Sequence, residues 1–176
     1  SYDENHDGFR DLPESDQINI ANKWLWQAKN GAQVRWGWKY VRENRLGGQM
    51  DYRKSLYDQM MEKQSIYGSH ISNRGANAYF KVGMPVGAAV YDEEAEDELR
   101  SNVAFVADYN YFKEDAYFGL NDYDAHDSAW WFNLMYAHYF SPRSSMVFGA
   151  SAQVTGSREK MLNRTIGGAE TPALWS

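Results

Sequence analysis

An acidic segment near the N-terminus has the residue types and the spacing of a calcium-binding loop. The run from Asp3 to Glu14 matches the pattern D-x-[DN]-x-[DN]-G-x5-E. Ca²⁺ takes six to eight oxygen ligands, and side chains at alternate positions converge on the ion when the chain wraps around it. The predicted ligands are Asp3, Asn5, Asp7 and the carbonyl of Phe9, with Asp11 or Glu14 closing the shell.

The surroundings of this segment do not fit the helix–loop–helix EF-hand fold. Arg10 stands where an apolar residue is usual, Pro13 interrupts the entry to a second helix, and no helix is predicted before Asp3. We therefore expect an isolated calcium-binding loop that leads into a strand, with calcium as a cofactor. The alternative is an acidic loop of Asx turns that binds no metal.

The other reactive side chains form no recognisable catalytic pattern. The chain has no Cys, which excludes thiolate zinc sites and thiol nucleophiles. Its 4 histidines lie outside any zinc or triad spacing, and the acidic cluster from Asn121 to Asp127 lacks the glycine of a calcium loop. The excess of 24 Asp and Glu over 18 Lys and Arg argues against a nucleic-acid partner. We expect neither an enzyme nor a nucleic-acid-binding protein.

The elements that position these residues are predicted to be strands, because apolar and polar residues alternate with period two. One parity carries Trp, Tyr, Val and Ile, and the other carries Lys, Arg, Asn, Gln and Gly. A tilted strand crosses a bilayer with ~9–11 residues, which is close to the length of most of these runs. We predict an all-β fold, an antiparallel meander of long strands that is part of a transmembrane β-barrel. The runs lie at 17–26, 32–40, 75–86, 102–110, 130–136 and 146–154.

The connections are predicted to alternate in length, as in outer-membrane barrels, which have short turns on one side and longer loops on the other. Short turns are expected at Trp26–Gly31 and Ser141–Ser144, and a medium link at Tyr91–Glu98. Longer segments are expected together on the opposite side, namely those before Pro13, around 43–72, around 113–127 and after Ser157.

The longest connection contains Tyr52, Leu56 and Met60 at helical spacing, which predicts a short amphipathic helix at Asp51–Gln64. Two interpretations stay open for this helix. It packs on its own barrel, or it offers an apolar patch to a ligand or a partner.

Charged and aromatic side chains are expected to mark the two environments of the barrel. On the polar parity, a set of cations either lines a positive lumen or pairs with Asp108 and other carboxylates. This set is Arg35, Lys39, Arg42 and Lys81. Aromatic residues suit two interfacial belts. One belt is Trp24, Trp26, Tyr136, Tyr139 and Phe140, and the other is Tyr40, Tyr111 and Trp130.

Several stretches resemble the barrel of TonB-dependent outer-membrane receptors, most closely those of Bacteroidetes-type bacteria. They cover nearly the whole chain in order: DENHDGFRDLP, NKWLW, VRWGWKYVRENRLGGQM, YFKVGMPVG, FGLNDYDAHDS and NLMYAHYF. The resemblance implies a large barrel closed by an N-terminal plug. Residues 1–176 would then be an internal piece of the barrel, with about six strands and no plug domain.

The resemblance also implies a function and a set of partners. Such receptors import a scarce ligand (a siderophore, haem, cobalamin or a glycan) across the bacterial outer membrane. The implied partners are outer-membrane lipid, the small-molecule ligand, TonB, the plug domain of the full-length protein and, as a further candidate, a surface lipoprotein. Two rivals stay open: a small ligand- or carbohydrate-binding β-barrel or sandwich with a calcium-organised loop, and a small outer-membrane enzyme barrel.

Overall fold

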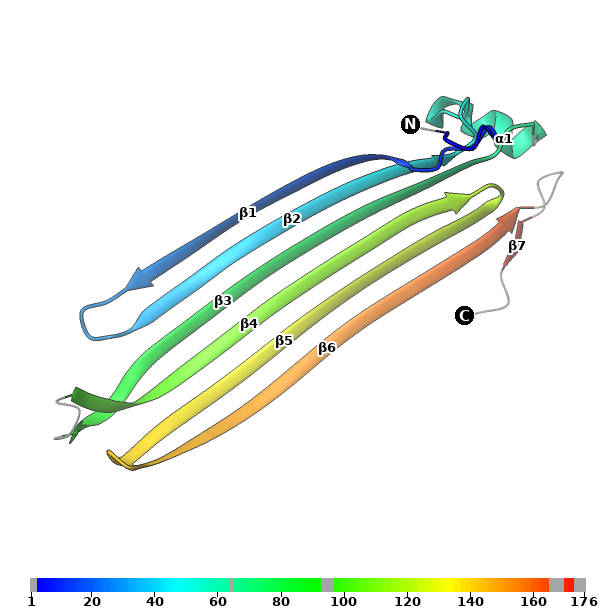
Figure 1. Ribbon diagram of the computed structural model, residues 1–176. Coiled ribbons are helices and arrows are strands. Elements are labelled where there is room, and N and C mark those ends of the chain that lie inside the picture. The colour runs from blue at the N-terminus through cyan, green and yellow to red at the C-terminus, as the bar shows by residue number, and fades with distance from the viewer. Residues whose placement is uncertain (1–2, 64, 93–96, 165–169, 173–176) are drawn as a thin grey trace.

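The chain folds into one long, curved layer of antiparallel strands, as the computed structural model shows (Figure 1). The structure describes residues 3–63, 65–92, 97–164 and 170–172. Each strand pairs with the next one along the chain. The strands are β1 (Glu14–Gln27), β2 (Gln33–Gly48), β3 (Gly68–Asp92), β4 (Asp97–Phe118), β5 (Asn121–Ser141), β6 (Ser144–Arg164) and β7 (Glu170–Pro172). The prediction of an all-β meander of long antiparallel strands is confirmed.

The sheet is open and does not close into a barrel. At one edge β1 pairs with β2 alone, and at the other edge the short strand β7 pairs with the last residues of β6. Within the described ranges no pairing joins these two edges. The free edge of β1 therefore presents unpaired backbone N–H and C=O groups to whatever lies beside it.

Strands β1 to β6 are longer than the alternation predicts, from 14 residues in β1 to 25 residues in β3. The connections expected at 43–72 and 113–127 are correspondingly too long. β2 continues to Gly48 and β3 begins at Gly68, while only Gly119 and Leu120 join β4 to β5. Backbone pairing does not depend on side-chain hydropathy, so the ladder continues where both faces have become polar.

The two ends of the sheet differ. At one end, here the turn end, Ser141 pairs directly with Ser144, and the β1–β2 turn is closed by a 2.8 Å hydrogen bond from the Ala28 N–H to the Ala32 carbonyl. The opposite end, here the loop end, carries the N-terminal segment, the 49–67 loop and the Gly119–Leu120 turn (Figure 1). The segment before Pro13 and the β2–β3 connection lie together at this end as predicted, whereas 113–127 contains only a two-residue turn and β6 continues past Ser157 to Arg164.

The loop between β2 and β3 carries the helical structure of the loop end. A 3-10 turn, η1 (Lys54–Leu56), leads into helix α1 (Tyr57–Lys63). The predicted helix at Asp51–Gln64 starts too early, because the backbone at Arg53 is extended, with φ −133° and ψ 153°. Its predicted last residue, Gln64, lies outside the described residues.

A small buried cluster fastens this loop to the sheet. Tyr52 and Met60 are 0% and 2% exposed and pack against Tyr117. The ring of Tyr52 lies over Gly68, where an added Cβ would come within 2.1 Å of the ring atom Cε1. Further apolar side chains surround the cluster: Leu46, Leu56, Tyr57, Met61 and Ile66. The helix thus packs on its own sheet, which is the first of its two interpretations.

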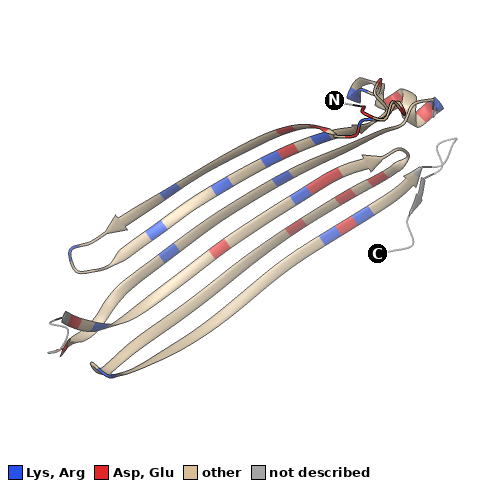
Figure 2. Cartoon of the chain, viewed as in Figure 1, with Lys and Arg blue, Asp and Glu red and all other residues tan. Residues whose placement is uncertain are grey.

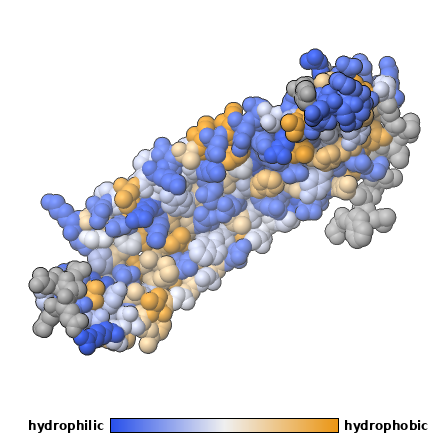
Figure 3. Space-filling model, in the orientation of Figure 1, coloured by the Kyte–Doolittle hydropathy of each residue, from blue (hydrophilic) through white to orange (hydrophobic). Residues whose placement is uncertain are grey.

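The strand register assigns every strand residue to one of two faces, because directly paired residues share a face and successive residues alternate. The aromatic face carries Trp24, Trp36 and Trp130, and the polar face carries Lys39 and Lys81. Hydrophobic residues reach the molecular surface along the sheet (Figure 3). In the middle of the strands, no second layer of described residues covers either face.

Candidate functional site

The aromatic face carries an apolar band that crosses β1 to β6. Five successive rows of cross-strand neighbours contain no Asp, Glu, Lys or Arg. Many of their large side chains are exposed, up to 62% for Val154. From the turn end, the rows are Met84, Val103, Tyr136, Phe148; Trp26, Val34, Val82, Phe105, Leu134, Ala150; Trp24, Trp36, Phe80, Ala107, Phe132, Ala152; Asn22, Trp38, Ala78, Tyr109, Trp130, Val154; and Ile20, Tyr40, Ala76, Tyr111, Ser128, Gly156.

The polar face is charged at the same height along the strands. Lys23, Arg35, Lys39, Lys81 and Asp108 all lie opposite the apolar band. Figure 2 shows the resulting contrast with β5 and β6, whose charged residues gather toward the loop end. The prediction that Arg35, Lys39 and Lys81 share the polar face is confirmed.

The expected pairing of these cations with Asp108 is not what the described residues form. The Asp108 carboxylate accepts hydrogen bonds from Asn77 Nδ2, at 3.1 and 3.2 Å, and from Asn110 Nδ2. Asn77 also donates to Asn110 Oδ1 at 2.8 Å. The polar face therefore holds an amide–carboxylate network and leaves Lys39 and Lys81 outside the ion pairs of the described chain.

Aromatic side chains occur in all five rows of the band and are most numerous in the middle row, while the predicted loop-end belt occupies the two rows nearest the loop end. Tyr40, Tyr111 and Trp130 lie there as predicted, and Trp130 contacts Tyr109 with ring centroids 4.5 Å apart. The second predicted belt is only partly formed. Trp24 lies in the middle row, stacked on Trp36, and Tyr139 lies on the polar face.

A row of basic side chains borders the apolar band on its loop-end side. Its members follow one another across β2 to β6: Arg42, Arg74, Lys113, His126 and Arg158. The prediction that Arg42 faces the polar side is wrong, because its parity places it with Tyr40 on the aromatic face. Only the cross-strand register shows that these residues form one row. Within its own strand, each member lies two residues from a residue of the apolar band.

The charges of the basic row are compensated unequally. Lys113 Nζ lies 2.9 Å from the Asp115 carboxylate and 3.5 Å from that of Asp124. In contrast, Arg42, Arg74 and Arg158 form no ion pair with any carboxylate of the described residues. The three guanidinium groups are therefore free to take an external anion.

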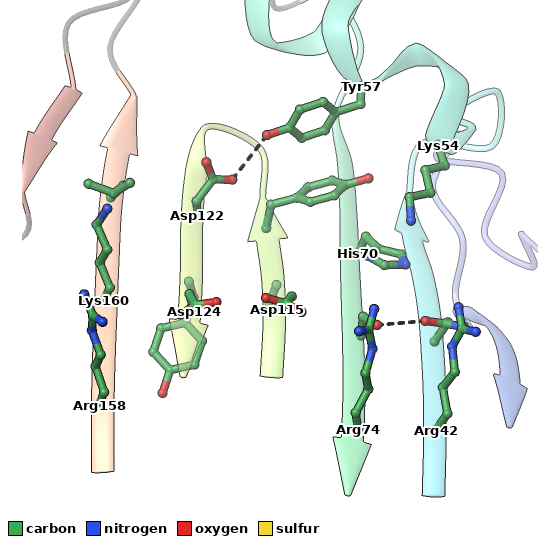
Figure 4. Close-up of a pocket in the computed structure, with 16 residues that line it drawn as sticks. Arg42, Lys54, Tyr57, His70, Arg74, Asp115, Asp122, Asp124, Arg158 and Lys160 are labelled. Carbon is green, nitrogen blue, oxygen red and sulfur yellow. Dashed lines mark hydrogen bonds between the residues drawn. The ribbon is translucent and has the colours of Figure 1, made fainter. Parts of the chain in front are cut away.

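A pocket of about 670 Å³ opens on the aromatic face beyond the basic row, below the η1–α1 loop (Figure 4). Lys54 and Tyr57 reach it from the loop, and Arg42 and Arg74 lie side by side on neighbouring strands. Its lining residues are Arg42, Asn44, Lys54, Tyr57, His70, Ser72, Arg74, Asp115, Ala116, Tyr117, Asp122, Tyr123, Asp124, Arg158, Lys160 and Leu162.

Hydrogen bonds and burial fix the inner wall of this pocket. The Tyr57 hydroxyl donates to Asp122 Oδ1 at 3.4 Å, and the hydroxyls of Tyr52 and Tyr117 lie 2.7 Å apart. Burial, together with this bond, raises the pKa of Tyr117. Burial and the positive charge of Lys54 lower the pKa of His70, which favours the neutral imidazole stacked on Tyr117.

The predicted calcium ligands lie in a chain of Asx turns at the loop end. Asp3 accepts hydrogen bonds from the N–H groups of Asp7 and Gly8 at 3.2 and 3.0 Å, and Asp7 accepts one from Phe9 at 2.8 Å. Asn5 Oδ1 accepts a bond from the Asp7 N–H at 3.1 Å. Gly8 supplies the left-handed turn, with φ 84°. Asp3, Asn5 and Asp7 are therefore brought together.

Asp11 and Glu14 have separate partners. Asp11 Oδ2 accepts a hydrogen bond from the Glu4 N–H at 2.6 Å, and the Glu14 carboxylate lies 3.5 Å from Arg10 Nε. The described residues include no group of three or more His, Asp or Glu side chains placed to hold a metal ion. Calcium binding by Asp3, Asn5, Asp7, Phe9, Asp11 and Glu14 stays a prediction.

Arg10 joins the N-terminal segment to the 49–67 loop. Its guanidinium donates to the carbonyls of Gln49, Met50 and Tyr52 at 2.8, 3.1 and 2.8 Å, and its side chain is 4% exposed. This role explains the arginine that departs from the EF-hand pattern. The sequence offers no local signal for it, because the three acceptors are backbone carbonyls some 40 residues away.

The described helical segments, η1 and α1, are too short and too polar to cross a membrane. Comparisons with protein-family models, with curated proteins and with solved structures give no match to this chain.

Proposed function

We propose that this chain forms part of the wall of a bacterial outer-membrane β-barrel of the TonB-dependent receptor type, which imports a scarce small-molecule ligand. The apolar band carries the proposal. Adjacent strands present charge-free rows of exposed Trp, Tyr and aliphatic side chains on one face and charged side chains at the same height on the other. In a barrel wall the apolar face would contact lipid outside and the charged face would contact water inside.

The height of the apolar band supports this assignment. From Met84 to Ala76 the band covers eight residue steps, or about 27 Å along the strand. A strand tilt of roughly 35–45° reduces this to about 20 Å, close to the ~25 Å apolar band of outer-membrane barrels. Tyr40 and Tyr111 in its loop-end row and Trp130 in the next row suit the interface between lipid and water.

The loop-end half of the sheet supports a role in ligand capture. β3 to β6 are 21 to 25 residues long, about twice the ~9–11 residues that a crossing needs. Their loop-end parts carry charged side chains on both faces, such as Lys113 and Arg158 on the aromatic face and Glu114 and Glu159 on the polar face, which suits a wall that projects from the membrane. The polar face would line a wet lumen, and the loops of this end would face the incoming siderophore, haem, cobalamin or glycan.

The open edges of the sheet support its being part of a larger assembly. An unpaired strand edge is costly in lipid, because its backbone groups find no water. Further barrel strands would pair with these edges, and the plug domain, TonB and a surface lipoprotein would be the partners of the complete receptor. In this setting calcium would organise the loop at Asp3–Glu14.

The test uses the absence of native Cys. Single cysteines at Ala78 and Val154 on the aromatic face, and at Gln153 and Thr155 on the polar face, carry a bimane fluorophore in the full-length protein reconstituted in vesicles. Brominated phosphatidylcholine is expected to quench the aromatic-face labels, and aqueous iodide the polar-face labels. Both quenchers act from within contact distance, so each label reports its own face.

A uniform response overturns the proposal. Iodide quenching of all four labels, with none by brominated lipid, places both faces in water. A full-length protein that stays monomeric in water without detergent also contradicts it, and supports the small ligand-binding barrel or sandwich instead.

A further inference from the structure

We infer that the basic row binds the phosphorylated headgroups of anionic lipids in the leaflet around the loop end. This inference rests on the proposed function, because it requires the apolar band to face lipid. Arg42, Arg74 and Arg158 supply the charge, and the pocket beyond them receives the headgroup.

The position of the basic row matches the place where a headgroup would lie. The row follows directly on the last apolar row, a step of about 6.7 Å along the strands. A lipid whose acyl chains lie along Tyr40, Ala76 and Tyr111 therefore brings its phosphate to Arg42 and Arg74. Cations just outside an apolar band attract anionic headgroups by about 1 kcal/mol each.

The charge arrangement within the row requires an anion. Arg42 pairs directly with Arg74, and Arg74 pairs directly with Lys113. Like charges directly opposite one another in a sheet are destabilising. Neighbouring strands lie ~4.8 Å apart, so one phosphate can accept hydrogen bonds from two guanidinium groups and offset their repulsion.

The carboxylates of the pocket do not neutralise these arginines. Asp115 and Asp124 are held by Lys113, and Asp122 accepts the Tyr57 hydroxyl. Burial opposes ionisation of Asp115, but its hydrogen bonds with Lys113 and Asp124 lower the pKa of this carboxyl, and the charge of Arg74 adds the smallest contribution without forming an ion pair. The guanidinium groups of Arg42, Arg74 and Arg158 retain their hydrogen-bonding capacity for a phosphate.

The shape of the pocket also suits a headgroup. Its volume of about 670 Å³ falls within the ~300–1,000 Å³ typical of small-molecule sites. Lys54 lies above it and Lys160 at its β6 side (Figure 4). Phosphate oxygens at the basic row could therefore extend toward two further amines.

The experiment measures lipid selectivity with the bimane label at Ala78→Cys, four residues from Arg74 on the same face. The full-length protein is placed in vesicles of brominated phosphatidylcholine or brominated phosphatidylglycerol, and the relative lipid affinity follows from the quenching. We expect a preference for phosphatidylglycerol of roughly fivefold or more, since ~1 kcal/mol per cation corresponds to about fivefold. Raising the salt concentration is expected to reduce it.

Matched variants assign the preference to the basic row. The double variant Arg42→Gln with Arg74→Gln is expected to lose it, while quenching by brominated phosphatidylcholine, which reports correct insertion, stays unchanged. The double variant Arg35→Gln with Lys81→Gln removes two cations of the polar face and is expected to retain the preference.

The outcomes separate this inference from the proposed function. Equal quenching by the two lipids overturns the inference but leaves the band in lipid. No quenching by either lipid overturns the proposed function. Loss of the preference when inorganic phosphate replaces chloride at equal ionic strength assigns the row to free phosphate, which also overturns the lipid assignment.

Discussion

At the loop end the 49–67 loop packs on the sheet at β2 to β4, whereas in the band half nothing among the described residues covers the strands. Almost every buried side chain belongs to the loop end, including Tyr52, Met60, His70 and Tyr117. In the band half, Trp26, Leu134 and Phe148 are more than half exposed. The same strands therefore pass from a part stabilised by packing to a part that needs an apolar solvent.

The two halves of the sheet are therefore stabilised by different forces. The loop end should keep its structure in water, because three interactions stabilise it together. These are the buried cluster around Tyr52, the hydrogen bonds from Arg10 to backbone carbonyls and the backbone pairing of the strands. Water does not stabilise the band half, because its exposed Trp and aliphatic side chains favour association with other apolar surfaces or with lipid.

The largest effect is expected from a charge at the centre of the apolar band. Ala152 lies in the middle row, so Ala152→Arg is expected to lower the free energy of unfolding in vesicles by ~2–4 kcal/mol. Urea unfolding of the reconstituted protein measures it. The matched variant Gln153→Arg, one residue away on the polar face, is expected to change stability little. Equal losses in both variants would contradict the assignment of the two faces.

A smaller effect is expected where the loop rests on the sheet. Gly68→Ala places a Cβ at 2.1 Å from the Tyr52 ring, which must move out of its buried site. Overpacking of this kind costs ~1–3 kcal/mol. Hydrogen exchange is expected to increase in the 49–67 loop but not in the band rows. In the control Gly75→Ala the nearest atom is 3.9 Å away, so exchange should stay unchanged. Increased exchange in the band would show that the two halves are coupled.

The next prediction concerns calcium binding by the N-terminal segment at the loop end. If Asp3, Asn5 and Asp7 bind Ca²⁺, calorimetry is expected to show saturable heat that is lost in Asp7→Ala. A concentration ten times the dissociation constant would stabilise the segment by about 1.4 kcal/mol. The control Asp16→Ala removes a carboxylate of β1 outside the loop and should bind normally. Absence of heat at millimolar Ca²⁺ would leave the segment as an Asx-turn loop.

The smallest effect concerns pH. Because burial and Lys54 lower the pKa of folded His70, the unfolded state binds the proton more tightly, and loop stability falls as pH drops below about 6.5. We expect the urea midpoint of loop undocking to decrease from pH 7.5 to pH 5.5. A fluorophore attached to the variant Ser55→Cys reports the undocking of the loop. His70→Gln should flatten this dependence, and an unchanged slope would place its origin elsewhere.

Much of the band half could be predicted from the sequence, because its two faces differ in hydropathy at every step. The alternation around Trp36 and Trp38 defines both strand and face. The loop-end half lacks this contrast. Around Lys113 and Asp124 both parities are polar, so the pattern suggests a loop although the backbone ladder continues.

The candidate site was harder to predict for a different reason. The basic row joins residues of five strands, and their alignment depends on the cross-strand register. Arg42 illustrates this: one residue of parity decides whether it faces a lumen or the membrane surface. Arg10 depends on distant carbonyls, for which a side-chain pattern carries no information.

The Gly119–Leu120 turn has a consequence for the order of folding. β4 and β5 are joined by two residues, while β2 and β3 are separated by the 49–67 loop. Closing a long loop costs more conformational entropy than forming a tight hairpin. The β4–β5 and β5–β6 hairpins, each joined by two residues, are thus expected to form early, and the pairing of β2 with β3 is expected to form late.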